Sequence, residues 1–308
     1  MTDTIVTFAI VNWNTCERLR ACLNSIAVHV SLPHQILVAD NASTDESVPM
    51  LEREFPKVDL IKCNRNLGFA GAHNLLIPLS KGKYHFLVNS DVIIKPRAIE
   101  TIVRRMEAEP DIAVAGCRIV GPDGLLQPSC RRFPSLWQQL LLATGLNRLA
   151  PRSRLWNGYL MGDFDHATSR DVDQVMGSIF AMRRTDCDEL GFLDTDYFMY
   201  FEEVDFCKRV KQAGKRVFFE ADAEVWHEGG GSSRQVRVLT IRRTMRSMRH
   251  YFHKHYGAWT WLPLLAIVSL DGVTHTLHAC VTSRNAWLTA KAYALGFLDV
   301  MTFRKASF

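Results

Sequence analysis

Several features typical of other protein classes are missing from this 308-residue sequence. None of its eight cysteines forms a Cys-x-x-Cys pair, so zinc or thioredoxin-like sites have little support. Most of the cysteines fall inside apolar patterns, which indicates small buried hydrophobic side chains in a reducing compartment. Internal repeats and low-complexity tracts are also missing. With 47% hydrophobic and 22% charged residues, the chain has the composition of an ordinary globular protein.

The N-terminus has little resemblance to a secretory signal. It begins Met-Thr-Asp-Thr and places no basic residue before the short apolar run Ile5–Val11. We interpret this run as a first strand rather than a signal peptide. We therefore expect the active domain to lie in the cytoplasm.

Acidic residues are missing from one long segment near the C-terminus. Between Gly229 and Leu270 there is no Asp or Glu, but there are seven Lys or Arg residues. Because the whole chain has a net charge of +5, the remainder sums to −2 and the basic character is local. A basic helix is predicted at about residues 236–255. The apolar run 259–270 that follows is too short to span a bilayer alone, and polar residues interrupt any extension, namely Asp271, His275 and His278.

A basic helix beside tryptophans is typical of a segment at a membrane interface. The alternative is a helical hairpin that packs on the catalytic domain or on another subunit. Basic helices also bind nucleic acid, but the sequence has no named nucleic-acid motif, so we expect no nucleic-acid partner.

The first third of the chain alternates short β-rich runs with helical patterns. Strands are predicted at 5–11, 35–39, 58–63 and 84–88, with helical spacing of apolar residues between them. This alternation predicts an α/β fold with a mostly parallel sheet flanked by helices. The middle, 116–173, is irregular, and its apolar stretch from Leu136 to Leu149 would be a lid or a packing helix.

Polar clusters follow the predicted strands. The most informative is Val88-Asn89-Ser90-Asp91, where a buried run ends in small polar residues and a carboxylate. Open α/β sheets bind ligands at this carboxyl edge. Similar clusters occur at 40–45, 64–71 and 201–205. Together they indicate a site for a nucleotide-sugar diphosphate and a divalent metal, although Asp91 alone would equally suit a helix cap or a turn.

These motifs occur in an order that resembles the inverting family-two glycosyltransferases of GT-A (Rossmann-like) fold, and most of all their rhamnosyltransferase-like branch, which builds cell-surface polysaccharides. The residues that carry the resemblance are Val11-Asn12-Trp13-Asn14, Asp40 to Asp45, Asn66 to Asn74, Asn89-Ser90-Asp91, Gly177 to Arg184, Phe198 to Asp205, and His227 before Gly229. Any single motif is weak, whereas the ordered set is highly specific. The resemblance implies a GT-A domain at 1–233 and a helical basic and apolar extension at 234–308.

The resemblance implies that Asp40 accepts a hydrogen bond from the pyrimidine ring N–H of the nucleotide. Glycines at 68 and 71 would let the backbone approach the ligand closely. Asp40 and Asp45 would equally serve as helix caps or turn residues. The residues implied to line the nucleotide pocket are Asn14, Asp40, Asn41, Asp45, Asn66, Gly68, Gly71, Asn74 and Asn89.

The Asn89-Ser90-Asp91 sequence is similar to the DXD metal motif of the family, with Asn in place of the first Asp. The resemblance implies that Asp91 and His227 bind a divalent metal, Mn²⁺ or Mg²⁺. The metal would neutralise the leaving nucleotide diphosphate. A supporting or purely structural role is the alternative for His227.

The acidic cluster at 202–205 takes the place of the catalytic base in the resemblance. Glu203 occupies the position of the base that deprotonates the acceptor hydroxyl, although the family usually has Asp there. Glu202 is the fallback, and Asp205 would orient an acceptor or a backbone amide. The alternative is that these acids simply favour a helix N-terminus.

The sequence therefore predicts a metal-dependent inverting glycosyltransferase that acts peripherally at the cytoplasmic face of the inner membrane. The resemblance makes dTDP-rhamnose the first donor to consider, followed by UDP-sugars, and implies a lipid-linked or polysaccharide acceptor. Asn89 and Glu203 keep open a rival, a non-catalytic nucleotide-sugar-binding scaffold of the same fold. A nucleotidyltransferase would need a glycine-rich, basic loop after the first strand, and residues 11–17 provide neither.

Overall fold

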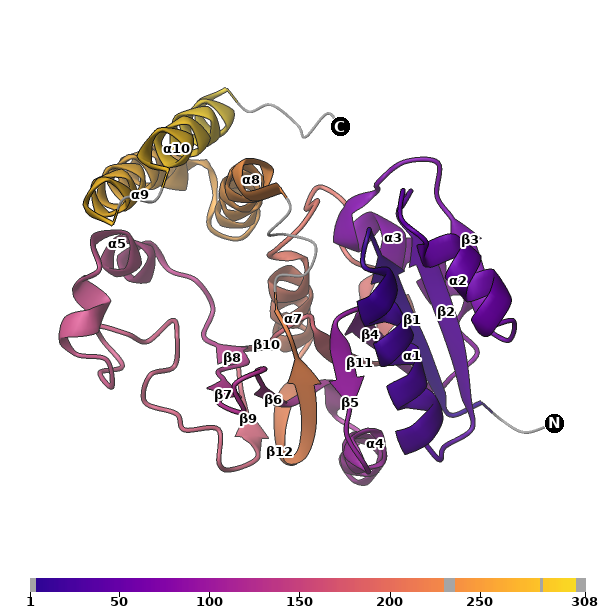
Figure 1. Cartoon of the computed structure of the whole chain (residues 1–308). Helices are drawn as coiled ribbons and strands as arrows, with labels where there is room; N and C mark the ends of the chain where they lie inside the picture. Colours follow the sequence, from indigo (N-terminus) through magenta and orange to yellow (C-terminus); the bar gives the residue numbers. More distant parts are fainter. Residues whose placement is uncertain (1–3, 230–235, 283–284, 303–308) are drawn as a thin grey trace. The chain divides into compact units, whose positions relative to one another are not determined.

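The computed structural model describes residues 4–229, 236–282 and 285–302 (Figure 1). The chain divides into two compact units. The first comprises Met1–Cys130, Asp165–Asp194 and Glu203–Ser232, and the second comprises Arg131–Phe164, Thr195–Glu202 and Ser233–Phe308. Each is described by itself below.

A large mixed sheet forms the centre of the first unit. Its strands follow the order β3-β2-β1-β4-β11-β6-β12-β5, and β7 and β9 extend it beside β6 and β12. The strands are β1 (Val6–Asn12), β2 (His34–Asp40), β3 (Asp59–Lys62), β4 (Tyr84–Asn89), β5 (Val92–Ile94), β6 (Ile112–Val120), β7 (Leu126–Gln127), β9 (Arg170–Asp171), β11 (Ile179–Arg183) and β12 (Arg216–His227). Two further short strands are β8 (Cys130–Arg131) and β10 (Gln174–Val175).

Most of the long strand pairs in this sheet are parallel. β1 pairs in parallel with β2 and β4, β2 with β3, and β6 with β12, whereas β11 and β5 run antiparallel to their neighbours. The register aligns Asn12 with Asp40 and Val11 with Asn89. The polar residues that end β1, β2 and β4 therefore meet at one edge. The predicted fold class, a mostly parallel α/β sheet flanked by helices, is confirmed.

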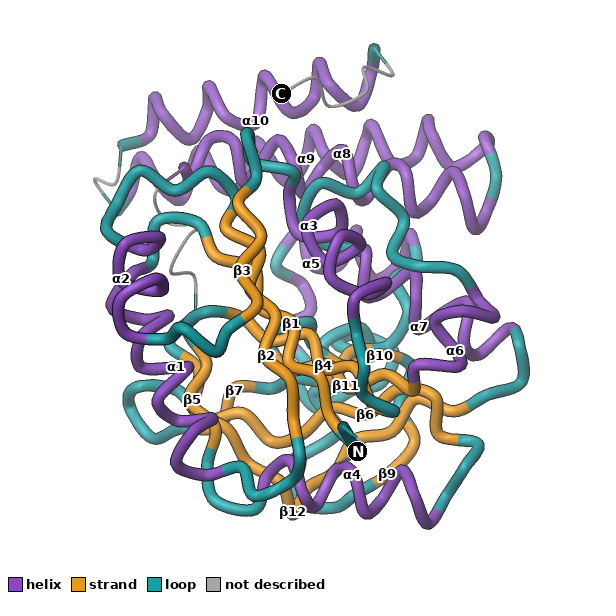
Figure 2. The backbone as a smooth tube through the Cα atoms, turned by 90° about the vertical axis from the view of Figure 1, so that its right-hand side faces the viewer, coloured by secondary structure: helices purple, strands orange, loops and turns teal. Residues whose placement is uncertain are grey.

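Helices cover both faces of this sheet. Apolar side chains of α1, α2 and α4 join Phe8, Ile10 and Phe86 in one core. The opposite face carries α3 and α7, where Phe206 packs on Phe180 of β11 with ring centroids 6.2 Å apart. Figure 2 shows α1 and α2 on one side of the strands and α7 on the other. The helices of the unit are α1 (Cys16–His29), α2 (Ser47–Glu54), α3 (Gly68–Leu76), α4 (Ala98–Ala108), α6 (Arg184–Leu190) and α7 (Glu202–Gln212), with a short turn η1 (Ile77–Leu79).

The second unit is helical. It contains α5 (Leu136–Thr144), α8 (Arg237–Tyr256), α9 (Trp261–Val281) and α10 (Ala286–Met301), with the short turns η2 (Leu146–Leu149) and η4 (Ala258–Thr260). α10 packs against both α8 and α9, and α5 packs against α9. Gly296 lets α10 approach α8 closely, because a Cβ at this position would overlap Sδ of Met245. The predicted C-terminal helices are therefore present.

The apolar run that begins at Trp259 does not end at Asp271. The helical segment Ala258–Val281 has 24 residues and contains an 18-residue window with a mean hydropathy of 1.4. By length and composition it is able to cross a membrane, a test that core helices of soluble proteins also meet. Asp271, His275 and His278 lie within this segment as predicted, but they do not end the helix: its backbone continues through them, and His275 Nδ1 lies 3.1 Å from Asp271 Oδ1, one turn away.

Candidate active site

A buried chain of hydrogen bonds joins the ends of three strands in the first unit. Asn12 Nδ2 donates to Asp40 Oδ1 over 2.9 Å, and Thr15 Oγ1 donates to Asn12 Oδ1 over 2.6 Å. The hydroxyls of Thr15 and Ser90 lie 2.7 Å apart. The chain therefore runs from β2 through β1 to the turn after β4, and it fixes the loops at this edge. Sequence reasoning quoted Asn12 within a motif but gave it no role, and it missed Thr15.

Asp40 lies inside this network and is 2% exposed. Its Oδ1 accepts from Asn12, and its Oδ2 accepts from the backbone N–H of Ser43 over 2.9 Å. A carboxylate oxygen has room for a further donor. The turn role that the sequence left open is thus real, and recognition of a pyrimidine N–H by Asp40 stays a prediction.

Asn14 and Asp45 fasten the loop that follows β2. Asn14 has a left-handed φ of 53°, which Asn tolerates, and its Oδ1 accepts from the backbone N–H of Thr44 over 2.7 Å. Asp45 Oδ2 accepts from the N–H of Cys16 at the start of α1, and its Oδ1 accepts from the N–H of Ser47. Asp45 therefore caps helix starts, which is the alternative that the sequence kept open for it.

Three further asparagines hold the loop before α3 and the helix itself. Asn41 Oδ1 accepts from Leu67 N–H and its Nδ2 donates to Gly68 O, over 3.2 and 3.1 Å. Asn66 Oδ1 accepts from Gly68 N–H over 2.9 Å, and Gly68 has a φ of +75° that favours glycine. In α3, Asn74 exchanges two hydrogen bonds with the backbone of Leu193. These side chains organise the backbone on which the predicted nucleotide pocket would be built.

Gly71 and Asn89 complete the predicted pocket residues. A Cβ at Gly71 would lie 3.2 Å from Cβ of Leu67, so a larger residue would crowd this loop. Asn89 ends β4, and its backbone N–H donates to Ser178 O over 3.0 Å. Asn89 lies at the edge where β1, β2 and β4 end, Gly71 lies within α3, and the contacts of both with a nucleotide stay predictions.

The structure brings the two predicted metal ligands together. β5 follows Asp91 directly and pairs with β12, so that Val92 lies opposite His227. His227 Nε2 lies 3.2 Å from Asp91 Oδ1, and both side chains are 7% exposed. His227 Nε2 makes no hydrogen bond within the described part of the chain. The predicted glycine run after His227 is described only to Gly229, since Gly230 and Gly231 lie outside the described residues.

Gln127 holds His227 from the other side. Its Nε2 donates to the backbone oxygen of His227 over 2.9 Å, and its Oε1 lies 3.2 Å from Nδ1 of the imidazole. An N–H on Nδ1 would donate to this oxygen and leave the lone pair of Nε2 directed at Asp91. Sequence reasoning missed Gln127, because nothing in the local sequence relates it to a histidine 100 residues later.

This donor set fits a divalent metal. A buried imidazole nitrogen without a hydrogen bond lies beside a buried carboxylate oxygen, and Mn²⁺ accepts both ligand types. The neighbouring strand end is fixed as well. Glu228 N–H donates to Asp91 O over 3.2 Å, and Arg18 binds the Glu228 carboxylate through two bonds of 2.5 and 2.8 Å. The hydrogen bond to Glu228 raises the pKa of Arg18, so this cation stays charged near Asp91.

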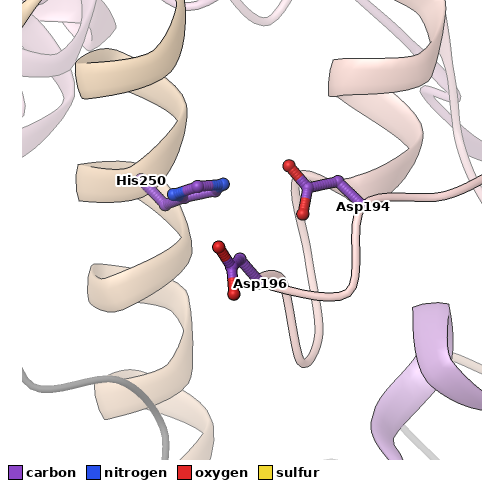
Figure 3. Close-up of side chains that lie close together, drawn as sticks. All are labelled: Asp194, Asp196 and His250. Atoms are coloured by element: carbon purple, nitrogen blue, oxygen red, sulfur yellow. The ribbon is translucent and has the colours of Figure 1, made fainter.

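A second pair of metal-type ligands occurs in the helical unit. Figure 3 shows Asp196 and His250 of α8 with their side chains close together, and their ligand atoms lie within 4.8 Å of one another. Asp196 is exposed, and exposed acidic groups are common without a metal. The His250 ring also packs on Tyr197, with centroids 4.6 Å apart. We assign no metal to this pair.

Glu203, the predicted base, is the second residue of α7. A Cβ at Gly177 would lie 3.8 Å from Cβ of Glu203 and 3.6 Å from Cζ of Phe69. Gly177 immediately precedes Ser178, whose carbonyl oxygen binds the N–H of Asn89. The glycine thus allows Glu203 to lie near the end of β4, at the same edge as Asp91.

The other two acids of this cluster differ from Glu203. Asp205 is fully buried, and its Oδ2 binds Nε of Arg209 over 2.9 Å. Arg209 in turn donates to three carbonyl oxygens, those of residues 190, 191 and 192. Asp205 therefore supports the loop before α7 through Arg209. Glu202 is buried, belongs to the second unit and follows Tyr200 and Phe201, whose left-handed φ values of 67° and 72° are unusual for aromatic residues.

A family comparison matches most of the part of the chain that contains this site. The family model described as "Glycosyl transferase family 2" matches residues 7–205, from β1 into α7. The chain belongs to glycosyl transferase family 2. The predicted family is therefore confirmed, and the site described above lies at the sheet edge of a family-two glycosyltransferase.

Curated relatives of this family-two glycosyltransferase cover most of its length. The N-acetylglucosaminyl-diphospho-decaprenol L-rhamnosyltransferase of Mycobacterium tuberculosis (strain H37Rv) is 27% identical over 275 residues, which cover 86% of this chain and 89% of the relative. The rhamnosyltransferase WbbL of Escherichia coli (strain K12) is 23% identical over 194 residues, 60% of this chain and 69% of the relative.

Solved structures confirm the GT-A fold. The mannosyltransferase PcManGT from Pyrobaculum calidifontis, in complex with GDP-Man and Mn²⁺, has a TM-score of 0.54 and 15% identity, covering 97% of this chain and 87% of that one. GalNAc-T7 with UDP, GalNAc and Mn²⁺ has a TM-score of 0.57 and 16% identity, covering 80% of this chain and 47% of that one. At these identities the likeness concerns the fold alone.

Proposed function

We propose that this glycosyltransferase transfers a sugar with inversion from a nucleotide diphosphate to a lipid-linked acceptor. The observation that carries the proposal is the approach of His227 Nε2 to Asp91 Oδ1 at the carboxyl edge of the sheet. dTDP-rhamnose is the first donor to test, because two relatives that cover 86% and 60% of the chain are named rhamnosyltransferases. UDP-sugars come next, since Asp40 would accept the ring N–H of thymine and uracil alike.

The proposed acceptor class follows from the mycobacterial relative, which covers 86% of this chain. Its name specifies an N-acetylglucosaminyl-diphospho-decaprenol acceptor, and it aligns with 86% of this chain. By analogy, the acceptor of this enzyme is a sugar attached through a diphosphate to a long isoprenoid. A lipid acceptor also suits the exposed apolar side chains of the C-terminal helices, which are more than half exposed at Trp259, Leu262, Leu277, Val281 and Trp287. We infer a peripheral contact with the cytoplasmic face of the inner membrane.

The chemistry assigns one step to each part of the site. Glu203 accepts the proton of the acceptor hydroxyl while that oxygen attacks the anomeric carbon, and the bonding electrons of the old linkage leave with the diphosphate. A positioned base contributes about 10²–10⁴-fold to such a step. Asp91 and His227 would hold a divalent metal, which supplies charge neutralisation to the departing diphosphate. A single displacement inverts the anomeric centre.

The test is donor turnover by the purified chain with membrane lipid as acceptor, across dTDP- and UDP-sugars with Mn²⁺ or Mg²⁺. Asp91→Ala and Glu203→Gln should each lower turnover by about 100-fold or more, as expected for loss of a metal ligand or a base. Two substitutions of exposed acids, Asp222→Ala and Glu52→Gln, are the matched controls, and each should keep native turnover.

Three results would contradict parts of this proposal. Retention of the donor's anomeric configuration in the product, read by NMR, would exclude the inverting displacement. Turnover that persists in a chelator would exclude the metal. Tight nucleotide binding without any turnover would favour the non-catalytic scaffold.

A further inference from the structure

An ion pair in the first unit links the start of α1 to the end of β12, next to both predicted metal ligands. Arg18 Nε donates to Glu228 Oε2 over 2.5 Å, and Arg18 Nη2 donates to Glu228 Oε1 over 2.8 Å. Glu228 directly follows His227, and its backbone N–H donates to Asp91 O over 3.2 Å. The residue that holds the guanidinium is therefore bonded to one predicted metal ligand and hydrogen-bonded to the other.

This ion pair is partly open to water, unlike the buried network around Asp40. The Arg18 side chain is 36% exposed and the Glu228 side chain is 30% exposed. Ion pairs with this much access to water contribute little to stability, because each partner is hydrated when the pair opens. Exchange of the Glu228 carboxylate for another anion therefore costs the protein little.

Arg18 brings a positive charge to a sheet edge that is rich in carboxylates. Asp40, Asp91 and Glu203 lie at this edge, and a bound nucleotide diphosphate would add further negative charge. The hydrogen bond to Glu228 raises the pKa of Arg18, and against the effect of burial the charges of Glu228 and Asp91 raise it further. Because the attraction between charges falls with distance, the contribution of Asp91 means that the guanidinium lies within its electrostatic reach.

We propose that Arg18 binds the diphosphate of the nucleotide-sugar donor, and that Glu228 holds the guanidinium in place until the donor arrives. A guanidinium fork matches two phosphate oxygens as well as it matches two carboxylate oxygens, so the diphosphate takes over both bonds from Glu228. Arg18 then stabilises the charge that develops on the departing diphosphate during sugar transfer. The proposal rests on the proposed function, because that function supplies the nucleotide diphosphate.

The alternative is that the ion pair only fastens β12 to α1. The two possibilities predict opposite effects when the carboxylate of Glu228 is removed. If Glu228 competes with the diphosphate for Arg18, Glu228→Gln frees the guanidinium and strengthens nucleotide binding. If the pair is only a structural link, the loss of either partner loosens the same strand end and weakens nucleotide binding.

The test is calorimetric titration of the full chain with dTDP and with UDP, each in Mn²⁺ and in a chelator. Arg18→Gln should weaken binding by about 10-fold or more, as expected for loss of charge-assisted hydrogen bonds, and Arg18→Lys should restore part of the loss. Glu228→Gln should strengthen binding about 3-fold, since an exposed ion pair no longer competes. Thymidine and uridine lack the diphosphate and should bind all of these variants equally.

A second ion pair of α1 provides the matched control. Arg20 Nε donates to Glu54 Oε2 on α2 over 2.7 Å, and the Arg20 side chain is 26% exposed. Arg20→Gln and Glu54→Gln remove the same charges from a comparable pair and should leave the affinity for both nucleotides unchanged. An unchanged thermal unfolding midpoint would show that each variant is folded.

The outcomes separate this proposal from the proposed function. Weaker binding in both Arg18→Gln and Glu228→Gln would make the pair a structural link and overturn the proposal, as would native affinity in Arg18→Gln. Sugar transfer at the native rate by Arg18→Gln would leave the proposed function intact and remove Arg18 from the site. Opposite shifts in the two variants of a chain that turns over no donor would support the role of Arg18 and contradict the transfer reaction. Failure of the native chain to bind dTDP or UDP would overturn both.

Discussion

Buried polar groups are paired differently at the sheet edge of the first unit and at Arg242, Arg243 and Arg246 on α8 of the second unit. At the sheet edge, Asp40, Asn12, Thr15 and Ser90 satisfy one another through consecutive hydrogen bonds. On α8, Arg242 and Arg246 share the carboxylate of Asp299 on α10, whereas the guanidinium of Arg243 lies 3.9 Å from the centroid of the Phe198 ring. The first arrangement is complete within the chain and can hold a rigid loop. The second carries more positive than negative charge.

Removing the carboxylate of Asp299 should have the largest effect on stability. Asp299→Asn would leave Arg242 and Arg246 partly buried without a counter-charge, and we expect the free energy of unfolding to fall by about 3 kcal/mol. Urea denaturation measures this directly. An exposed ion pair offers the control: Glu52→Gln, which breaks the pair with Lys62 where both side chains are 55% exposed, should cost under about 1 kcal/mol. Inorganic diphosphate should restore part of the loss only in Asp299→Asn; no restoration would contradict the surplus of charge.

Two buried histidines of the first unit differ from the hydrogen-bonded polar groups at its sheet edge. His73 of α3 and His85 of β4 are fully buried, and none of their four ring nitrogens has a hydrogen bond inside the described residues. Burial lowers the pKa of His85 from 6.5 to about 3 and lowers the pKa of His73 well below 6.5. Above pH 6.5 both rings are neutral in the folded and unfolded chain. Below it, only the unfolded chain takes up protons, so stability falls as the pH falls.

These two histidines predict an acid sensitivity that replacement of His85 removes. Between pH 7 and pH 5 each histidine should cost about 2 kcal/mol of unfolding free energy. Between pH 7 and pH 5, the unfolding free energy of His85→Leu should therefore fall by about 2 kcal/mol less than that of the native chain. Denaturation at each pH measures this. The exposed His253→Gln should lose as much as the native chain. An identical pH dependence in His85→Leu and the native chain would mean that His85 is hydrated.

The smallest expected effect concerns the predicted metal ligands Asp91 and His227. It tests whether Gln127 orients His227 through a hydrogen bond. Gln127→Leu would remove the acceptor for His227 Nδ1 and let the ring change tautomer or turn. We expect Mn²⁺ binding to weaken about 10-fold, as for other partners that orient a metal-binding histidine. Gln127→Glu keeps an acceptor and should restore much of the affinity. Rescue by Glu, followed by Mn²⁺ titration and the pH profile of binding, separates orientation of the ring from a purely structural role.

The first four strands could be predicted from sequence because each is a short apolar run with polar ends. The predicted strands 84–88 and 35–39 correspond to β4 (Tyr84–Asn89) and β2 (His34–Asp40). The long strand β12 (Arg216–His227) is harder to read from sequence, because it passes through an irregularity between Glu220 and Glu224. Such a register shift depends on the neighbouring strand β6, which a local pattern does not contain.

The candidate site was predictable by residue type but not by partner. Asp91 and His227 could be named from their motifs, whereas their separation of 3.2 Å depends on the pairing of β5 with β12. Gln127 carries no local signal of its role. The partners of Arg246 and Arg242 on α8 could not be read from the sequence for a similar reason, since Asp299 lies 53 and 57 residues further along the chain. Long-range partners decide whether a charged helix face is solvated.

The loop that precedes α7 has a consequence for any attempt to shorten the protein. Phe198 and Met199 belong to the helical unit and contact Arg243 and Ser247 of α8, yet the same peptide runs directly into Glu203. A stop codon after residue 233 would keep this loop and delete the residues that support it. We expect such a truncation to loosen the start of α7, so loss of activity would not report on lipid contact. Point substitutions on the exposed side of α9 or α10, such as Trp287→Ser, are the cleaner genetic dissection.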